Sequence, residues 1–392
     1  MSTRLSFPMP KVVMLVSNPF RPDVRVYKEA KTLVEKGYDV EVIAWDRDNA
    51  FKERERISVI TITRARVRSR YDNFLSMVLS LPLFYSVALW KLLRDGNSIV
   101  HCHDLDTLPL GFFAAKVKGT KVVYDAHESY PDMVADSSPP LAVGFLRWIE
   151  KYLVKRVDAV ISTTEQMEKR FSGYGAKKLA VVANCAELQS PSDNVRVSEL
   201  RASLGVKDET MLIYIGILES IRGLKGIIEG FGKHAGKEYK FVIGGFGPIE
   251  SEIRKACEGV ESVKFIGFVR LESVFLYNQA ADVLIITSDP SKGHAPISVN
   301  NKVFEAMVAG RPVIVSRGTA SAGIVESEHS GICIGYGNQD ELFAALKRLR
   351  SDRRFYDELC RNGMYAARTK YNWAVMEERL AAIYESLAQK QT

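Results

Sequence analysis

The chain has 392 residues, more than one ordinary hydrophobic core accommodates, so two domains are expected. Its net charge of +7 suits an anionic small molecule, an anionic membrane surface or nucleic acid, and does not choose among them. Five scattered cysteines without a CxxC pair argue against a disulfide framework and indicate reduced thiols of a cytoplasmic protein. The N-terminus lacks the apolar core of a signal peptide.

Apolar, β-rich runs alternate with amphipathic stretches, which is typical of doubly wound parallel sheets in an α/β fold. The strands predicted in the first half are residues 12–17, 39–44, 58–63, 98–101, 121–125, 159–162 and 179–183. Those predicted in the second half are residues 211–216, 239–244, 263–266, 282–287, 312–316 and 331–334. A polar segment around Pro191 predicts a boundary between domains 1–190 and 191–370, and a last helix lies within 371–392.

The segment after the first predicted strand opens an amphipathic helix. Asp23 is a suitable N-cap, and Gly37 ends the helical pattern. Arg25 and Lys28 lie in the first turns, where the helix dipole disfavours cations. They are therefore candidates to face an anion across a cleft.

The most apolar stretch, residues 73–93, follows four alternating arginines, Arg64, Arg66, Arg68 and Arg70. Its length is marginal for a membrane span, and Pro82 weakens that interpretation further. A helix lying at an anionic membrane surface and an ordinary core helix beside a solvated strand remain open.

Histidines mark the ends of two further strands. His101, Cys102, His103 and Asp104 resemble a metal cluster, but strand spacing places only the histidines on one face. No second ligand group lies at a zinc-like spacing, so no metal site is predicted. His127 ends the next strand, where it is a candidate to bind a sugar hydroxyl or take a proton, with a structural role equally open.

Two glycine-containing loops follow strands of the second half. Gly216 is followed by Arg222 and Lys225, cations suited to grip a phosphate. Gly245 and Gly247 resemble part of the dinucleotide-binding fingerprint. Glu250 replaces its third glycine, which counts against a nicotinamide-dependent dehydrogenase.

Residues 300–316 predict a short helix that stops at Gly310 and leads into a buried strand. Free N–H groups at a helix start bind anions, and Lys302 adds a positive charge. Glu305 shares a face with Lys302 and is a good acceptor for a pair of sugar hydroxyls. This combination suits a nucleotide or a nucleotide sugar.

Several segments together resemble glycosyltransferases of family 4, retaining enzymes with the GT-B fold. They include "DVRVYKEAKTLVEKGYDVEVIA", "VHCHDLDTLPLG", "VVYDAHESYP", "YIGILESIRGLKGIIEGF", "GGFGP" and "NKVFEAMVAGRPVI". The resemblance covers nearly the whole chain. It implies two Rossmann-like domains facing across a cleft, an acceptor-binding N-terminal domain, a donor-binding C-terminal domain, and a last helix that crosses back onto the N-terminal domain.

The resemblance also implies roles for individual residues. Glu305 would hold the ribose hydroxyls, and His127 would contact the donor sugar. The diphosphate would meet Arg222, Asn300, Asn301 and Lys302, with Gly216 and Lys225 in the same donor site, while the base would lie near Gly245, Gly247 and Phe268. In the cleft, Arg25 and Glu128 are assigned to the acceptor side.

Two positions depart from the family pattern. Ile297 replaces a glutamate found in many members eight residues before the ribose-binding one, and Ile217 replaces an arginine of the first loop. The first change leaves recognition of the donor hexose unassigned. His294 is a candidate to replace the lost glutamate.

The predicted activity is retaining, metal-independent transfer of a hexose from a UDP- or GDP-linked donor, with no cofactor. The acceptor would be a hydroxyl of a lipid-linked saccharide or polysaccharide precursor. The protein is expected in the cytoplasm, with peripheral contact to the membrane and no nucleic-acid partner. Two alternatives remain: a GT-B sugar-nucleotide epimerase and a non-catalytic sugar-nucleotide-binding protein.

Overall fold

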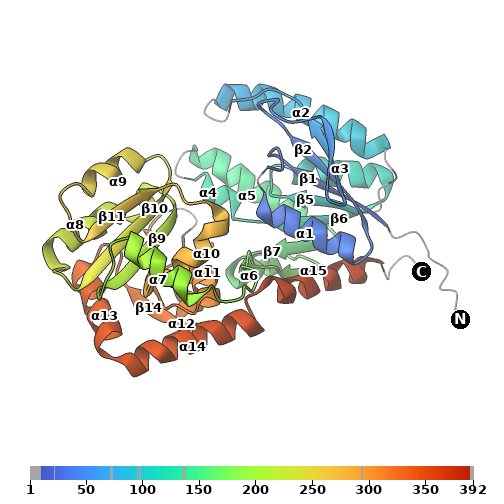
Figure 1. The fold of residues 1–392 in the computed structure, drawn as a ribbon. Helices are drawn as coiled ribbons and strands as arrows, with labels where there is room; N and C mark the ends of the chain where they lie inside the picture. The colour runs from blue at the N-terminus through green and yellow to red at the C-terminus, as the bar shows by residue number, and fades with distance from the viewer. Residues whose placement is uncertain are drawn as a thin grey trace, which may run out of the picture. The chain divides into compact units, whose positions relative to one another are not determined.

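The chain forms two compact units (Figure 1). The computed structural model describes residues 10–21, 23–70, 74–94, 96, 99–135, 138–292 and 295–388. Unit 1 consists of Met1–Ala183 and Met376–Thr392, and unit 2 consists of Asn184–Val375. The division between the units falls near the expected positions 190 and 371.

Unit 1 is built on an eight-stranded sheet with the order β3-β4-β2-β1-β5-β6-β7-β8. Every pairing is parallel except that of β3 with β4. The strands are β1 (Lys11–Val16), β2 (Asp39–Trp45), β3 (Arg54–Ile57), β4 (Ile60–Ala65), β5 (Ile99–His103), β6 (Lys121–Ala126), β7 (Ala159–Ser162) and β8 (Leu179–Val181). The central strands are buried almost throughout, as expected for a parallel sheet with helices on both faces.

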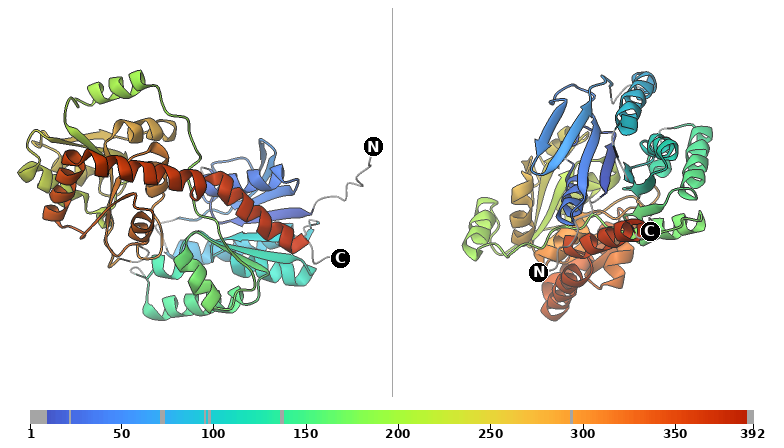
Figure 2. Two further views of the ribbon diagram at one scale, coloured as in Figure 1. Left: turned by 90° about the horizontal axis from the view of Figure 1, so that it is seen from below. Right: turned by 90° about the vertical axis from the view of Figure 1, so that its right-hand side faces the viewer.

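The helices of unit 1 form two layers. On one face, α1 (Val24–Glu35) packs beside α15 (Trp373–Ala388), and the Thr32 hydroxyl donates a hydrogen bond to Glu377. On the other face, α3 contacts both α2 and α5. The helices of that second layer are α2 (Phe74–Arg94), α3 (Leu108–Lys118), α4 (Tyr130–Met133), α5 (Pro140–Val154) and α6 (Glu165–Gly173). Figure 2 shows the strands between the layers.

Unit 2 has a six-stranded parallel sheet with the order β11-β10-β9-β12-β13-β14. Its strands are β9 (Thr210–Ile217), β10 (Tyr239–Phe246), β11 (Val263–Gly267), β12 (Val283–Ile286), β13 (Val313–Ser316) and β14 (Gly331–Ile334). Its helices are α7 (Asn194–Ser203), the 3-10 turn η1 (Ser220–Arg222), α8 (Leu224–His234), α9 (Glu250–Ala256), α10 (Leu271–Ala280), α11 (Lys302–Ala309), α12 (Ala320–Ser327), α13 (Gln339–Ser351) and α14 (Arg353–Thr369).

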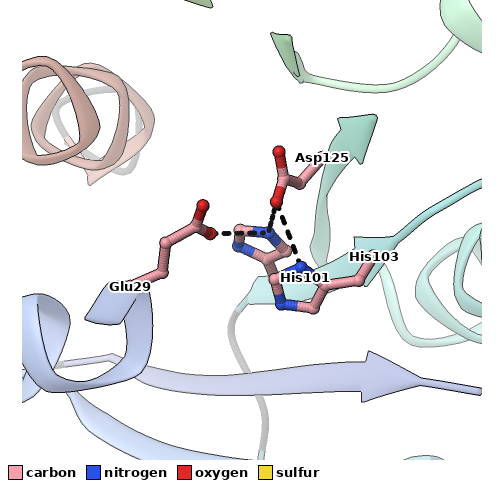
Figure 3. Close-up of side chains that lie close together, drawn as sticks. All are labelled: Glu29, His101, His103 and Asp125. Carbon is pink, nitrogen blue, oxygen red and sulfur yellow. Dashed lines mark hydrogen bonds and ion pairs between the residues drawn. The ribbon is translucent and has the colours of Figure 1, made fainter. Parts of the chain in front are cut away.

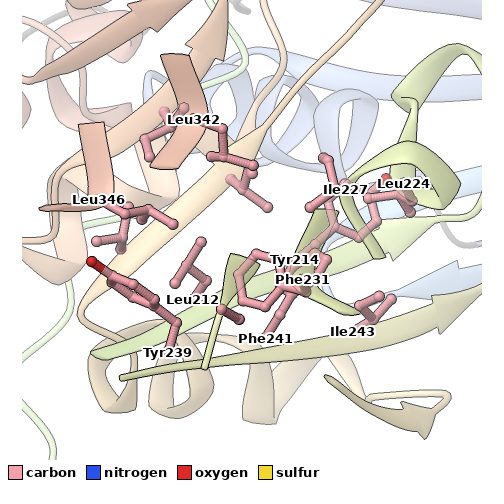
Figure 4. Packing of buried hydrophobic residues seen from close by; sticks show 14 of the residues in the cluster. Leu212, Tyr214, Leu224, Ile227, Phe231, Tyr239, Phe241, Ile243, Leu342 and Leu346 are labelled. Carbon is pink, nitrogen blue, oxygen red and sulfur yellow. The ribbon is translucent and has the colours of Figure 1, made fainter. Parts of the chain in front are cut away.

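One hydrophobic core joins the unit 2 sheet to the helices on one of its faces (Figure 4). Phe241 of β10 packs against Phe231 of α8, with ring centroids 5.3 Å apart. Leu342 and Leu346, one turn apart on α13, belong to the same buried cluster. The amphipathic stripes of α8 and α13 therefore anchor the sheet and fix the ends of its strands.

The two doubly wound parallel sheets of the sequence analysis are confirmed, and so is the return of the last helix to the first unit. All thirteen predicted strands are present, with bounds that differ by a few residues at most. The charged strand β3 was not predicted. Asp23 caps α1 by accepting from the Val26 N–H at 3.0 Å, and Gly310 ends α11 with φ of 66°.

The first of the four alternating arginines does not belong to a solvated strip. Arg64 is fully buried, and its guanidinium donates to the carbonyls of Pro19 and Lys52 and to Glu55. Arg66, Arg68 and Arg70 are exposed beside α2. No helix in the described part of the chain combines the length and apolar content that crossing a membrane requires.

Candidate functional site

The candidate donor site lies in unit 2, where loops leave the carboxyl ends of β9, β10 and β12. The strand order reverses between β9 and β12, because β10 and β11 lie on one side of β9 while β12, β13 and β14 lie on the other. Ligands of open α/β sheets bind at such a switch point. The predicted residues Gly216, Arg222 and Lys302 all lie near it.

Arg222 is tied across the switch point. Its Nη1 donates to Ser288 Oγ at 2.8 Å, and its Nη2 donates to Glu219 at 3.2 Å. The Thr287 hydroxyl donates to the Arg222 carbonyl at 2.5 Å. Its Nε is buried and has no hydrogen-bond partner in the described structure. The guanidinium is therefore positioned by the protein, yet one of its donors is unsatisfied.

Lys302 begins α11 and lies over the end of β9. A Cβ added to Gly216 would come within 2.4 Å of Lys302 Cε and 2.7 Å of its Nζ, so a side chain there would displace the Lys302 ammonium from this position. The Lys302 N–H donates to the Asn300 side chain at 3.2 Å, which shapes the start of the helix. No carboxylate of the described residues pairs with the Lys302 ammonium, so its charge adds to the positive helix end.

Glu305 lies one turn further along α11 and is half-buried. In the part of the chain that the structure describes, its carboxylate takes part in no hydrogen bond or ion pair. Asn301 is exposed at the N-cap and makes no capping bond through its side chain. The start of α11 thus presents donors, a cation and a carboxylate that are all still able to bind a ligand.

The two glycines after β10 are explained by close backbone packing. Gly245 has φ of 137°, and a Cβ there would lie 1.8 Å from the Gly216 carbonyl oxygen. Gly247 has φ of 155°, and a Cβ there would lie 2.5 Å from the Leu218 carbonyl oxygen. Both positions need glycine so that the loops after β9 and β10 can touch. Their presence therefore does not require a bound nucleotide.

An exposed aromatic pair lies beyond these glycines. The rings of Phe246 and Phe268 have centroids 5.7 Å apart, and the two residues are 54% and 66% exposed. Ile217, which replaces the family arginine, is also exposed. Side chains this apolar and this exposed at strand ends offer a surface on which a flat ring can stack.

Two further residues were assigned to the donor site from the sequence. Lys225 is half exposed and forms a 2.9 Å ion pair with Glu252 of α9, so its charge is partly neutralised by the protein. His294 lies outside the residues that the structure describes.

Unit 1 contains a second group of charged residues, and it is buried. The prediction that Arg25 faces an anion in a cleft is wrong, because the residue is only 4% exposed and both Asp125 oxygens accept from its guanidinium, at 2.7 and 3.2 Å. Its third donor bonds the Val182 carbonyl at 2.7 Å. Glu29 pairs with Arg25 at 2.9 Å. The unexpected cation in the first turn of α1 thus serves the interior of unit 1.

His101 and His103 join this network from β5 (Figure 3). As predicted, they share one face of the strand, with ring centroids 4.3 Å apart. His101 Nδ1 and the Tyr384 hydroxyl of α15 lie 2.6 Å apart. Glu29, Asp125 and both histidines bring possible metal-ligand atoms within 4.8 Å of one another. A cation at that point would compete with the Arg25 guanidinium, which already holds the Asp125 carboxylate through two hydrogen bonds, so the group is better described as a buried polar network around the Arg25–Asp125 ion pair.

His127 stands at the edge of the same network. Its Nε2 lies 2.9 Å from Asp125 and its Nδ1 lies 3.5 Å from Asp104. Burial would lower the pKa of His127, but the two carboxylates outweigh burial and raise the pKa to about 10. Burial likewise opposes ionisation of Asp125, yet Arg25 and His127 hold its pKa well below the usual value. His127 is therefore an imidazolium at neutral pH and can donate a proton in a hydrogen bond, but it cannot accept one.

Glu128 is half-buried next to His127, and among the described residues no partner engages its carboxylate. The residues that the sequence analysis missed are Glu29 and Asp125 of the network and Ser288 of the proposed donor site, and it did not foresee the approach of Asp104 to His127. Asp125 and His127 are two apart at the end of one strand, a spacing that places them on the same side. That spacing was the available signal for the pair.

Comparison with known proteins gives a consistent result. The family models for Glycosyltransferase Family 4 and for Glycosyl transferases group 1 match residues 23–190 and 209–352. An uncharacterized glycosyltransferase of Methanocaldococcus jannaschii is 25% identical over 368 residues, covering 91% of this chain and 92% of that protein.

Solved structures agree with the fold. Sucrose-phosphate synthase from Thermosynechococcus elongatus superimposes with a TM-score of 0.80 at 17% identity, over 97% of this chain and 100% of the other. Anabaena HepE in complex with UDP-glucose superimposes with a TM-score of 0.73 at 16% identity, over 96% of this chain and 100% of the other. The sequence matches and the fold together show that the chain belongs to the GT-B glycosyltransferases of the family 4 type.

Proposed function

We propose that the protein transfers a hexose from a nucleoside diphosphate sugar to a hydroxyl group of a saccharide acceptor, with retention of configuration at the anomeric carbon. The observation that carries this proposal is the set of unengaged groups at the start of α11. The Lys302 ammonium and the Glu305 carboxylate lack partners in the described structure, and they lie one turn apart beside a guanidinium whose Nε is also unsatisfied.

Charge complementarity assigns the diphosphate to Arg222, Lys302 and the α11 N–H groups, including those that follow Asn300 and Asn301. Negative charge builds up on the diphosphate as it leaves, and cations already positioned by the protein stabilise that charge. Two such cations and a helix end provide this stabilisation from the protein itself, so we propose that transfer is metal-independent. Gly216 contributes by leaving space for Lys302.

Glu305 suits the ribose, since a carboxylate accepts from two neighbouring hydroxyls. The exposed pair Phe246 and Phe268 suits the base, which would stack on the rings beside Gly245 and Gly247. The UDP-glucose bound to Anabaena HepE, a protein of the same fold, supports a uridine donor.

His127 is assigned to a hydroxyl of the transferred sugar. Its Nε2 is engaged with Asp125, whereas its Nδ1 is 3.5 Å from the nearest carboxylate oxygen of Asp104 and is the donor left for a ligand. With a pKa of about 10, the imidazolium carries this N–H throughout the physiological range. Such a donor fixes the orientation of the sugar, which retention of configuration requires. Glu128, whose carboxylate has no partner among the described residues, is assigned to the acceptor.

The test is a panel of UDP-, GDP- and ADP-linked hexoses, each assayed by thermal shift and by release of the nucleoside diphosphate with and without saccharide acceptors. A donor should raise the melting temperature of the wild type, because it binds the folded state. Glu305→Gln should abolish most of that shift. Glu229→Gln, which changes an exposed carboxylate of α8, is the matched control and should bind as the wild type does.

The panel also separates the alternatives. Turnover of the sugar without an acceptor would identify an epimerase. A large thermal shift with no product under any acceptor would identify a non-catalytic binding protein. A shift that survives both Glu305→Gln and Lys302→Ala would place the donor elsewhere and refute the proposed site.

A further inference from the structure

The exposed apolar side chains of unit 1 are gathered on one of its two helix layers. The layer of α2, α3 and α5 carries many of them, and the right-hand view of Figure 2 shows these three helices together on one side of the strands. On the opposite layer, Val24 is the large apolar residue of α1 that is exposed, and the described part of α15 has none. This asymmetry calls for an explanation, because folding alone would bury such groups or scatter them.

The clearest part of the surface is a stripe along α5. Leu141, Phe145, Trp148 and Tyr152 follow the spacing of one helix face and are 90%, 58%, 59% and 42% exposed. The rings stack in sequence, with centroids 5.8 Å apart from Phe145 to Trp148 and 5.7 Å apart from Trp148 to Tyr152. The other face of α5 is the one that packs inward, through Val143, Leu153 and Val154. The helix is thus apolar on both faces, although only one of them meets the core.

The neighbouring helices extend this surface. Leu79, Leu83 and Trp90 are exposed on α2, and Phe113 and Val117 are exposed on α3. Since α3 contacts α2 on one side and α5 on the other, the three sets belong to one layer. We call this layer, with its exposed side chains, the three-helix surface.

The charges of the three-helix surface have one sign. The sequences of α2, α3 and α5 contain a single acidic residue, Glu150, which is buried and hydrogen-bonded to the Tyr124 hydroxyl at 3.0 Å. The exposed cations on these helices and just beyond α5 are Arg94, Lys116, Arg147, Lys151, Lys155 and Arg156. Of these, Arg147 forms a 2.7 Å ion pair with Asp132 of α4, so the other five carry the net positive charge. By contrast, α15 on the opposite layer carries Glu377, Glu378 and Glu385.

Cations also lie against the exposed rings. The Arg94 guanidinium is 4.5 Å from the centre of the Trp90 ring, and that of Arg156 is 3.6 Å from the centre of the Tyr152 ring. Indole and phenol rings next to basic groups are the side chains favoured at the headgroup level of a bilayer. A basic residue near an anionic leaflet is attracted to its lipid headgroups.

We propose that the three-helix surface docks unit 1 on an anionic lipid bilayer, with the α5 stripe inserted to the level of the headgroups. A second copy of the chain is a poorer occupant. A symmetric dimer would place this cationic surface against itself with no exposed carboxylate on the three helices to compensate. The inference is independent of the donor site, since it concerns other residues in the other unit.

The test is flotation of the full chain with vesicles of phosphatidylcholine alone and of phosphatidylcholine mixed with phosphatidylglycerol. The wild type should bind the mixed vesicles and not the neutral ones, and added salt should weaken the binding. The triple variant Leu141→Ser, Phe145→Ser, Trp148→Ser should bind at least about tenfold less. A matched triple variant at exposed apolar positions of unit 2, Val195→Ser, Leu271→Ser, Tyr365→Ser, should bind as the wild type does.

Tryptophan fluorescence gives a second readout. Two of the four tryptophans, Trp90 and Trp148, are exposed on the three-helix surface, whereas Trp45 and Trp373 are buried. Mixed vesicles should shift the emission of the wild type to shorter wavelength, and Trp148→Ser should reduce the shift. Because every substituted side chain is exposed, the variants should keep the melting temperature of the wild type.

Three results would overturn the proposal. One is absence of binding to mixed vesicles at low salt. Another is equal loss of binding in both triple variants. The third is self-association of the wild type that the α5 variant abolishes in the absence of lipid, which would assign the surface to a second copy.

Discussion

The two groups of charged residues in this molecule differ in what satisfies them. In unit 1, the Arg25 guanidinium donates to Asp125 and to the Val182 carbonyl, and it lies 2.9 Å from Glu29. Around this pair, both Glu29 oxygens and the Nε2 atoms of His101 and His103 are buried without a hydrogen bond among the described residues. In unit 2, Arg222 keeps an unsatisfied Nε, while Lys302 and Glu305 have no partner in the described structure. We therefore expect the first group to stabilise the fold, and we assign the second to the proposed donor.

The comparison shows how a charged residue is to be interpreted. A buried ion pair costs desolvation that its partners must compensate, so its members are fully committed. A binding group must remain under-satisfied until the ligand arrives. His127 has features of both groups, because carboxylates of the buried network set its charge while a fifth of its side chain stays accessible.

The largest effect is expected when the buried network loses its central carboxylate. Asp125→Ala leaves the Arg25 guanidinium buried without its main partner, which should cost about 3–5 kcal/mol of unfolding free energy. The melting temperature of unit 1 should fall by roughly 10 °C in calorimetry. Asp39→Ala, at an exposed strand start, should leave it unchanged. Equal melting temperatures for both variants would show that the network is not stabilising.

The under-satisfied cations of unit 2 should show the opposite behaviour, with a loss of activity and little change in stability. Arg222→Ala and Lys302→Ala should each lower kcat/KM with the preferred donor by roughly 10²–10³-fold, since each removes charge that stabilises the departing diphosphate. Their melting temperatures without donor should stay close to that of the wild type. Steady-state kinetics and thermal unfolding measure the two effects separately. A large loss of stability with retained activity would reverse the roles assigned to the two clusters.

The pH dependence of stability tests the network more finely. Burial raises the pKa of Glu29 from 4.5 to about 8 against the attraction of Arg25, so the residue is protonated in the folded state. It ionises more easily when unfolded, and stability should therefore fall as pH rises from about 4.5 to 8. His127, with its pKa raised from 6.5 to about 10, adds stability that is complete below pH 6.5 and lost as pH rises through 10.

Glu29→Gln removes the first of these contributions, because the amide does not ionise. The difference in stability between pH 5 and pH 8 should shrink by roughly 1–3 kcal/mol, measured by denaturant unfolding at each pH. His127→Gln should instead flatten the profile above pH 6.5. An unchanged slope in Glu29→Gln would mean that Glu29 is ionised inside the protein.

The smallest effect is expected at Lys225. Its pair with Glu252 is exposed and screened by solvent, so Lys225→Ala should leave the melting temperature close to that of the wild type. It should change the KM for the donor less than about threefold, because its charge is already partly neutralised. If Lys225→Ala weakened donor binding as much as Lys302→Ala does, Lys225 would contact the donor after all.

The sequence was sufficient for most of the fold because buried parallel strands are continuous apolar runs between recognisable helix ends. It failed at β3, an exposed antiparallel edge with the sequence RERI, which has no apolar run to detect. The α5 stripe was also missed. Its apolar residues fit an ordinary core helix, and only the structure shows which face is outside.

The residues of the proposed donor site could be singled out from the sequence because a helix start with a lysine and a glutamate has a local signature, and their role in binding stays a prediction. The burial of Arg25 could not be predicted from a local pattern, because its partner Asp125 is one hundred residues away in the sequence and Val182 is further still. The burial of Arg64 was equally unpredictable, because the carbonyls that accept from it belong to Pro19 and Lys52 in other segments of the chain. Local patterns identify which residues are unusual, whereas distant partners decide whether they are free.

The return of α15 to unit 1 has a consequence for biosynthesis. Tyr384 approaches His101 within 2.6 Å and packs against Tyr38, so the first unit contains a part that is translated only after all of unit 2. During synthesis the second unit, which is continuous in the chain, can complete itself first. Residues 1–183 of unit 1 lack the packing partner that α15 provides until synthesis is complete. We expect the need for a chaperone to be greatest during that interval.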